Sequence, residues 1–216
     1  MQKTFQCLIV AALLILGLNT SAQAAGYYIG FLGGGSFLPE SKANDALGST
    51  NFSFDGGFDG SISLGYDLGT AYPKIGRGRV ELEFNKASND LDEAEFIDNS
   101  SGASGSAERT SIMLNTIGEY TTQSGIIIYA LLGLGWAEIS LDNVSIMGEL
   151  FVDDSNSQLA YQLGFGFGRR LSEHLTVDIG YRFYGTTSQD FTKEDGTRLD
   201  FEYASHRVVA GLRLNF

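Results

Sequence analysis

Residues 175–183 read LTVDIGYRF, and this stretch decides the fold of the chain. Apolar side chains occupy every second position from Leu175 to Phe183, and the positions between them hold polar residues or glycine. Consecutive side chains of a β-strand point to opposite faces. The stretch therefore predicts a strand with one apolar face and one face that carries Asp178 and Arg182.

The same alternation recurs along the chain and predicts eight strands. They cover residues 27–38, 57–68, 77–87, 108–121, 126–139, 157–170, 175–187 and 201–216. Long connections at 39–56, 88–107, 140–156 and 188–200 alternate with shorter ones, such as 122–125 and 171–174. Bacterial outer-membrane barrels combine an even number of strands with long external loops and short periplasmic turns. We therefore predict an all-β fold, an eight-stranded antiparallel transmembrane up-and-down β-barrel.

The two faces of the predicted strands differ in polarity. A cation that faces lipid at mid-depth in the bilayer costs about 2 to 4 kcal/mol, so we assign the apolar face to lipid. This face includes Ile62, Leu64, Tyr66, Val80, Leu82, Phe84, Ile112, Leu114, Ile126, Ile128, Leu132, Leu134, Trp136, Leu159, Tyr161, Leu163, Phe165, Phe167, Ile179, Tyr181, Val208, Leu212 and Leu214. Aromatic residues near the strand ends predict interfacial girdles. They are Tyr66, Tyr120 and Phe216 at one rim and Phe84, Trp136, Tyr184 and Phe201 toward the other.

The opposite face carries six acids and six arginines, which we place in the barrel lumen. They are Asp59, Asp67, Arg79, Glu81, Glu83, Arg109, Glu119, Arg170, Asp178, Arg182, Arg207 and Arg213. The candidate ion-pair residues among them are Arg79, Glu81, Glu83, Glu119, Asp178, Arg182, Arg207 and Arg213. An eight-stranded barrel is only wide enough for side chains to fill its interior, so we expect paired charges and no open channel. A gated ion path through the same residues is the alternative.

The first 24 residues predict a cleaved export signal. Lys3 precedes an apolar core at Leu8–Leu18, and Ala22-Gln23-Ala24 forms a small-x-small cleavage site. Residues 25–216 would then form a single barrel domain. This part carries 13 cations and 26 acids, a net charge of −13, which argues against nucleic-acid binding. The only cysteine, Cys7, lies in the signal, so no thiol chemistry is expected in the remainder.

The chain resembles the small outer-membrane β-barrel family of opacity-like proteins and related bacterial surface antigens. The resemblance spans residues 25–216 and is carried by the segments GYYIG at 26–30, SLGY at 63–66, RVELEF at 79–84, AYQLGFG at 160–166, LTVDIGYRF at 175–183 and VAGLRLNF at 209–216. It implies a barrel in the outer membrane of a Gram-negative bacterium, with outer-membrane lipids, lipopolysaccharide and the barrel-assembly machinery as partners. The terminal Phe216 looks like the family's carboxyl-terminal assembly signal. The family has no shared reaction, and the resemblance implies no cofactor. The first strand, 27–38, has apolar residues on both faces, so its register stays undecided.

Few residues have the spacing of a catalytic or metal site. His206 follows Ser205, but neighbouring residues of a strand face opposite ways, so we predict no nucleophile–base pair. Neither histidine has a partner at metal-ligand spacing, and no metal site is predicted. The acidic connections at 88–107 and 140–156 are interpreted as solvated loops, with a Ca²⁺ or lipopolysaccharide bridge as the alternative.

The sequence predicts a non-enzymatic outer-membrane barrel with a structural, adhesive or surface-antigen role in its external loops. The external partner is unknown. Two alternatives remain: narrow porin-like transport of ions or small solutes, and a lipid-modifying barrel enzyme that uses His206.

Overall fold

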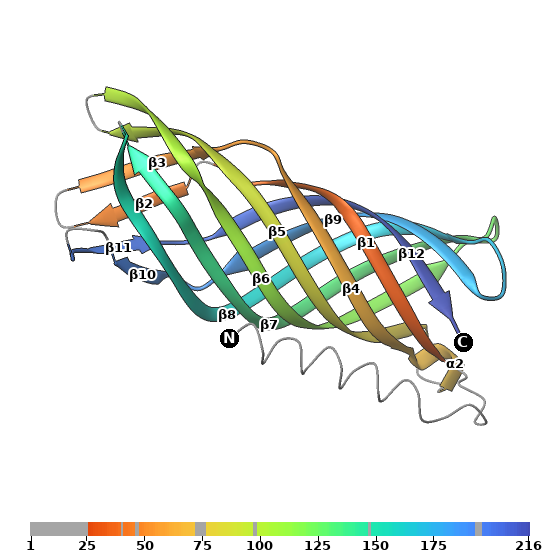
Figure 1. Cartoon of the computed structure of the whole chain (residues 1–216). Coiled ribbons are helices and arrows are strands. Elements are labelled where there is room, and N and C mark those ends of the chain that lie inside the picture. Colours follow the sequence, from red (N-terminus) through yellow and green to blue (C-terminus); the bar gives the residue numbers. More distant parts are fainter. Residues whose placement is uncertain are drawn as a thin grey trace.

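The computed structural model describes residues 26–39, 41–45, 48–71, 77–96, 99–146, 148–192 and 196–216. The predicted export signal at 1–24 therefore lies outside the described residues. Within them, no helix is long and apolar enough to cross a membrane. The described chain is built almost entirely of antiparallel strands (Figure 1).

Eight strands form the wall of the barrel. They are β1 (Tyr27–Phe37), β4 (Gly57–Asp67), β5 (Gly78–Phe96), β6 (Asn99–Thr121), β7 (Ile126–Ile146), β8 (Glu149–Arg170), β9 (Leu175–Thr186) and β12 (Ala204–Asn215). Each strand pairs antiparallel with its neighbours, and the pairings of β1 with β12 and of β5 with β6 close the ring. The predicted eight-stranded barrel is confirmed.

The outward side chains of the wall are the apolar ones that the alternation predicts. Leu132 and Leu134 on β7 are 54% and 58% exposed, whereas the intervening positions point inward. The first strand, whose register the sequence leaves undecided, follows the same rule, since Tyr28 is buried and Phe31 is exposed. Its register is set by ladders on both sides, with Tyr28 opposite Gly65 and Asn215.

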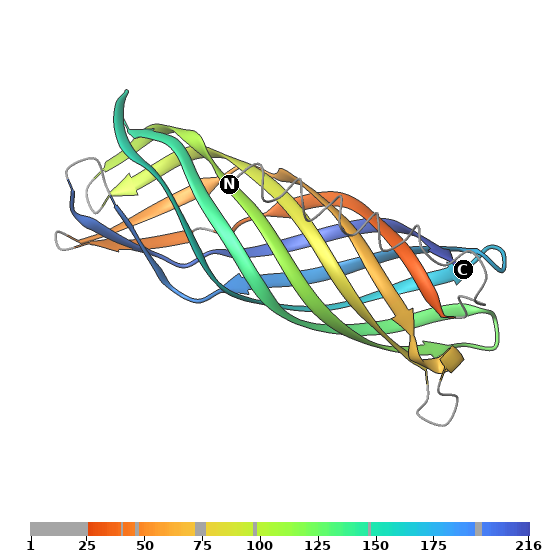
Figure 2. The same ribbon diagram turned by 60° about the horizontal axis from the view of Figure 1, so that its bottom comes forward.

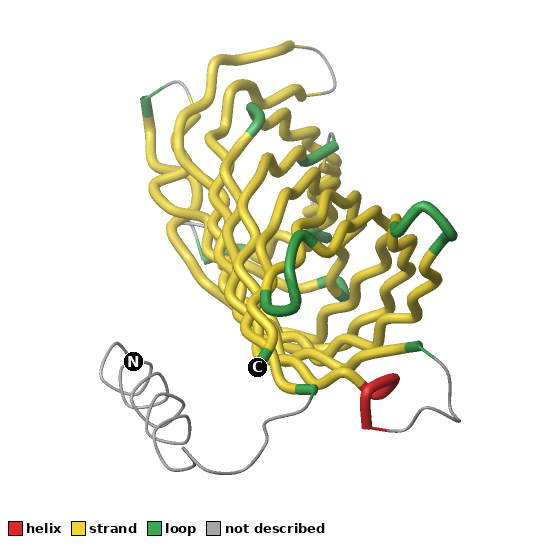
Figure 3. Tube along the Cα trace, turned by 90° about the vertical axis from the view of Figure 1, so that its right-hand side faces the viewer, coloured by secondary structure: helices red, strands yellow, loops and turns green. Residues whose placement is uncertain are grey.

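One end of the barrel carries the short connections and the C-terminus, and we call it the turn end (Figure 2). The connections at 122–125 and 171–174 are tight, as predicted. After β4 the chain forms the single-turn helix α2 (Leu68–Ala71), shown in red in Figure 3, which views the molecule from this end. Because periplasmic turns are the short ones, the turn end is the periplasmic side.

At the opposite end, which we call the outer end, the structure differs from the sequence prediction. The connections predicted as solvated loops are largely strands. Strand β5 continues to Phe96, β6 begins at Asn99, β7 continues to Ile146 and β8 begins at Glu149. The other two connections contain β2 (Ser41–Asp45), β3 (Gly48–Phe54), β10 (Gln189–Thr192) and β11 (Arg198–Phe201). These four strands extend the sheet from β5 in the order β3, β2, β11 and β10. The outer end is therefore a structured lobe that extends beyond the lipid-facing wall, at the left of Figure 1.

The reason for this error is visible on β7. Up to Trp136 its outward residues are apolar, but Glu138, Ser140 and Asp142 continue the same face. Meanwhile the inward residues Ile139 and Leu141 become the apolar ones and are buried. The polarity of the alternation thus reverses where the strand leaves the lipid. A prediction based on one continuous alternation of apolar and polar residues therefore ends the strand at that point.

Candidate functional site: the filled lumen

Two clusters of charged side chains fill the lumen within the lipid-facing part of the barrel. The upper cluster lies nearer the outer end and consists of Asp59, Glu83, Asn85, Arg109, Asn115, Gln162, Arg182, Ser205 and Arg207. The lower cluster lies nearer the turn end and consists of Tyr28, Arg79, Glu81, Glu119 and Arg213. All these residues except Glu119, which is slightly more exposed, are buried.

Two carboxylates organise the upper cluster. Asp59 accepts hydrogen bonds from Arg109 Nη2 at 2.7 Å and Arg207 Nη2 at 2.5 Å. Glu83 accepts one from Arg182 Nη1 at 2.7 Å and lies 3.4 Å from Arg207 Nη2. Each carboxylate thus contacts two guanidinium groups, and Arg207 contacts both carboxylates. Charges can be buried in this way only when they are paired and hydrogen-bonded.

Neutral amides complete the upper cluster. Asn115 Nδ2 and Gln162 Nε2 donate to Glu83 Oε2 at 2.7 and 3.1 Å. Gln162 Oε1 accepts from Arg207 Nη1 at 3.0 Å, and Asn85 Nδ2 donates to both oxygens of Asp59 at 3.1 Å. Charge alone does not identify these amides in the sequence, although they lie on the predicted lumen face. Their positions on that face are the signal that would have found them.

The lower cluster repeats this arrangement with one shared carboxylate. Glu119 pairs with Arg79 and accepts a hydrogen bond from Arg213 Nη1 at 3.1 Å. Glu81 Oε1 accepts from Arg79 Nε at 3.0 Å and from Tyr28 Oη at 2.6 Å. The Tyr28 ring lies over Gly65, where an added Cβ would sit 2.0 Å from Tyr28 Cζ. Gly65 therefore gives Tyr28 room to reach across the lumen.

Arg109 joins the upper cluster to an apolar core above it. Its guanidinium carbon lies 3.9 Å from the centre of the Tyr184 ring and 5.4 Å from that of Tyr203. Both tyrosines are fully buried. A desolvated cation–π contact of this kind is worth about 2 kcal/mol. The prediction that Tyr184 belongs to an interfacial girdle is wrong, because its position on β9 faces inward; the side chain of Phe201 lies outside the described side chains.

We call the apolar core the outer core. Its buried residues are Leu38, Leu91, Ala107, Met113, Ala137, Ile139, Leu141, Val144, Val152, Ala160, Tyr184, Phe191 and Tyr203, with Phe54 packed against them. These residues come from the barrel strands and from β3, β10 and neighbouring segments. The lumen is therefore filled in three successive layers: the lower cluster, the upper cluster and the outer core.

Seven of the eight candidate ion-pair residues take part in the two clusters. Asp178 faces the lumen, but it is only half-buried, and no ion pair joins it to another described residue within 4 Å. Of the larger predicted lumen set, Arg170 is exposed, because β8 ends there at the rim of the barrel. Phe216 is also exposed, and its backbone N–H donates to Tyr27 O at 3.0 Å.

Ser205 and His206 point in opposite directions. Ser205 is buried and accepts a hydrogen bond from Arg109 Nη1 at 2.9 Å. His206 lies on the outer surface, where its Nδ1 is 2.6 Å from Tyr181 Oη. The two side chains do not form a nucleophile–base pair. In the described part of the chain, no group of three His, Cys, Asp or Glu residues could hold a metal ion.

The outer lobe is strongly acidic. The external segments 39–56, 86–108, 138–156 and 188–202 together contain 19 acidic residues but 4 lysines and arginines. Burial and the neighbouring carboxylates of Glu108 and Asp153 raise the pKa of Asp142, which lies outside the lipid-facing wall. The exposed cation Lys86 pairs with Glu108 at 2.9 Å. The lobe therefore presents a negative potential to the exterior.

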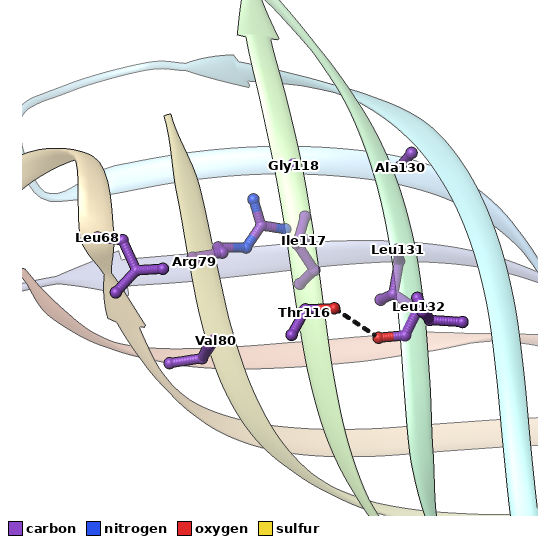
Figure 4. A pocket seen from close by; sticks show the side chains of 9 residues that line it. All are labelled: Leu68, Arg79, Val80, Thr116, Ile117, Gly118, Ala130, Leu131 and Leu132. Atoms are coloured by element: carbon purple, nitrogen blue, oxygen red, sulfur yellow. Dashed lines mark hydrogen bonds between the residues drawn. The ribbon is translucent and has the colours of Figure 1, made fainter. Parts of the chain in front are cut away.

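A pocket of about 360 Å³ lies near the turn end, beside α2. It is lined by Leu68, Arg79, Val80, Thr116, Ile117, Gly118, Ala130, Leu131 and Leu132 (Figure 4). A Cβ added at Gly118 would meet open space. Thr116 Oγ1 donates to the carbonyl oxygen of Leu132 at 3.2 Å, so this hydroxyl is already hydrogen-bonded within the barrel wall. The lining offers no catalytic group besides Arg79, which already belongs to the lower cluster.

A closed barrel with an apolar exterior and a charged, filled interior defines the class of integral outer-membrane β-barrels. The family model described as the outer membrane protein beta-barrel domain matches residues 8–216. The chain belongs to this family and is an integral protein of the outer membrane. No curated protein matches the chain.

Solved barrels share the fold at low sequence identity. Neisserial surface protein A aligns with a TM-score of 0.54 and 21% identity, over 89% of this chain and 98% of its own. The outer membrane protein OprG from Pseudomonas aeruginosa gives the same TM-score with 13% identity, over 89% of this chain and 97% of its own. Both support the fold.

Proposed function

We propose that the protein is a non-enzymatic barrel that holds a structured acidic lobe at the cell surface for recognition, and that no solute passes its lumen. The observation that carries the proposal is the three-layer filling of the lumen. Ion pairs that span the interior, such as Arg182–Glu83, are followed by an apolar core instead of a water-lined path. Recognition by exposed segments on a rigid scaffold is a common division of labour in proteins.

Planar-bilayer recording tests whether the lumen is closed. We expect no conductance steps from the purified wild-type protein, and none from Arg182→Ala, because the outer core remains above the altered cluster. A large open porin, recorded in parallel, serves as the positive control. Reproducible conductance steps from the wild type that Arg182→Ala changes in size would overturn the proposal and favour ion transport.

The proposal includes export through a cleaved signal at residues 1–24 and membrane contact with lipids and lipopolysaccharide. It also includes insertion by the barrel-assembly machinery, with Phe216 as the recognised end. The exposed ring of Phe216 supports this role, because the inner contacts of the barrel do not use it.

Deletion of Phe216 should slow insertion in cells and leave protease-sensitive protein in the periplasm. We expect this result because the barrel-assembly machinery would no longer recognise the end of the chain. Pure lipid vesicles contain no such machinery, so the deleted chain should refold into them at close to the wild-type rate. Heat-shifted electrophoresis of pulse-labelled cells measures the folded fraction, and Phe216→Tyr is the matched control that keeps a terminal aromatic ring. Normal insertion of the deleted chain in cells would contradict the role.

A further inference from the structure

The pocket beside α2 opens on the outer, lipid-facing side of the barrel wall. Two of its lining residues, Ile117 and Leu131, are 2% and 4% exposed and lie beneath it. The lining residues that alternate with them on β5, β6 and β7 point outward. They are Val80, Thr116, Gly118, Ala130 and Leu132, all labelled in Figure 4. We call this pocket the wall groove.

Small side chains account for the wall groove. Gly118 lies opposite Gly78 of β5 and Ala130 of β7, so three small residues are neighbours on the outer face. A Cβ added at Gly118 would meet nothing within 4 Å. Leu68 of α2 and Leu132 of β7 also line this space, which measures about 360 Å³. The result is a narrow, mainly apolar hollow in the wall.

The wall groove runs from the membrane interface into the hydrocarbon of the periplasmic leaflet. Tyr120 follows Gly118 on the same face of β6 and is 67% exposed. Tyrosines at such positions lie at the level of the lipid headgroups. Leu132, farther from the turn end, belongs to the apolar face of β7. An acyl chain of a phospholipid in the periplasmic leaflet therefore has the depth and direction needed to lie in the groove.

Two exposed arginines lie on the rim of the turn end near the wall groove. Arg77 directly precedes β5, and its carbonyl oxygen accepts from Glu119 N–H at 3.2 Å, which places Arg77 at the turn-side end of the groove. Arg169 lies on the outward face of β8, opposite Ile126. Asp67 and Glu119, the acids next to the groove in the described part of this rim, occupy lumen-facing positions. The outward surface beside the groove is therefore cationic, in contrast to the acidic outer lobe.

We propose that the wall groove binds one anionic phospholipid of the periplasmic leaflet, with an acyl chain over Gly118 and the phosphate against Arg77. Arginine suits the phosphate because its planar guanidinium donates two parallel hydrogen bonds. Arg169 adds a second positive charge near the headgroup, and clustered cations favour anionic lipids. The site lies at the opposite end of the molecule from the acidic lobe. It therefore goes beyond the proposed recognition function and rests only on the position of the barrel in the outer membrane.

A phospholipid fits both the apolar groove and the cationic rim. Lipid tails are as apolar as the wall itself, so a tail in the groove gains packing contacts and little hydrophobic free energy. Discrimination between lipids must then come from the headgroup and the two arginines. A second copy of the barrel fits less well, because a symmetric dimer uses the same surface on both subunits. It would bring the exposed arginines of the two copies together.

Native mass spectrometry of the barrel released from detergent micelles tests the choice of headgroup. The barrel is titrated with phosphatidylglycerol, which is anionic, and with phosphatidylcholine of the same acyl chains, which has no net charge. We expect one phosphatidylglycerol per barrel, bound about tenfold more tightly than phosphatidylcholine. The double variant Arg77→Ala with Arg169→Ala should reduce this preference to less than twofold. Equal affinity of the wild type for the two lipids, or an unchanged preference in the double variant, would overturn the inference. Displacement of the lipid by glycerol phosphate would also overturn it, because the headgroup would then bind without the groove.

A matched pair of glycine variants tests the groove itself. Gly118→Leu fills the groove, whereas Gly33→Leu adds the same side chain to the lipid-facing side of β1, where a Cβ also meets nothing within 4 Å. Gly118→Leu should weaken phosphatidylglycerol binding at least fivefold, and Gly33→Leu should change it less than twofold. Heat-shifted electrophoresis checks the folding of both variants, and the arginine variants test the same site if Gly118→Leu fails to fold.

Equal effects of the two glycine variants would contradict a lipid in the groove. A wild-type dimer that Gly118→Leu dissociates would also contradict it, because the groove would then hold a second copy of the barrel. Neither result bears on the lumen proposal, which depends on the conductance recordings.

Discussion

Glu83→Ala should lower the free energy of unfolding by about 3 to 5 kcal/mol. The carboxylate of Glu83 is fully buried and contacts Arg182 at 2.7 Å and Arg207 at 3.4 Å. Its removal leaves Arg182 as a buried cation without its counter-charge, and two amide donors lose their acceptor. Urea titration in lipid vesicles, followed by the fluorescence of the single tryptophan, Trp136, measures this loss.

The control is the exposed pair on the outer surface. Lys86→Ala breaks the Lys86–Glu108 pair, whose side chains are 64% and 37% exposed, and should cost less than about 1 kcal/mol. A second comparison separates loss of pairing from loss of packing. The double variant Glu83→Met with Arg182→Met should be more stable than Glu83→Ala, because it leaves no unpaired Arg182. A Glu83→Ala protein that unfolds at the wild-type urea concentration would mean that water screens the upper cluster.

The sequence predicts the wall of the barrel well because, in a strand that lies against lipid, the direction in which a side chain points also determines its polarity. A charge such as that of Arg182 would be costly on the outer face. Residues 175–183 therefore alternate strictly, and the strand can be predicted from this alternation. Pairing partners inside the lumen are harder to predict. Whether Glu83 meets Arg182 or Arg213 depends on the relative stagger of strands around the ring, and side-chain parity carries no information about stagger.

The outer lobe differs from the sequence prediction for a different physical reason. Above the lipid the solvent changes from hydrocarbon to water, so the apolar face of each strand moves to the inside. Ile139 and Leu141 continue β7 with reversed polarity, and their polar neighbours resemble a solvated loop. Tyr184 illustrates the same difficulty, since an aromatic residue near a strand end fits both a girdle and a core. Its contact with Arg109 comes from the folded ring and not from a local motif.

The second large effect is expected at Leu132, on the lipid-facing side of β7. Leu132→Arg should destabilise the inserted barrel by about 2 to 4 kcal/mol, because its guanidinium would lie within the apolar band. Leu132 is 54% exposed, so the cost does not come from steric crowding inside the barrel. Urea titration in lipid vesicles again gives the free energy of unfolding. No reducing agent is needed, because residues 25–216 contain no cysteine.

Ser140→Arg is the matched control, since residue 140 lies on the same strand and the same face as Leu132. It follows the reversal of polarity between Trp136 and Glu138, and the outward carboxylates of Glu138 and Asp142 are its neighbours. The new cation should therefore change stability by less than about 1 kcal/mol. The contrast between the two arginines locates the edge of the hydrocarbon on β7. If Leu132→Arg were as well tolerated as Ser140→Arg, the apolar face would not lie against lipid, and the reversal of polarity would need another cause.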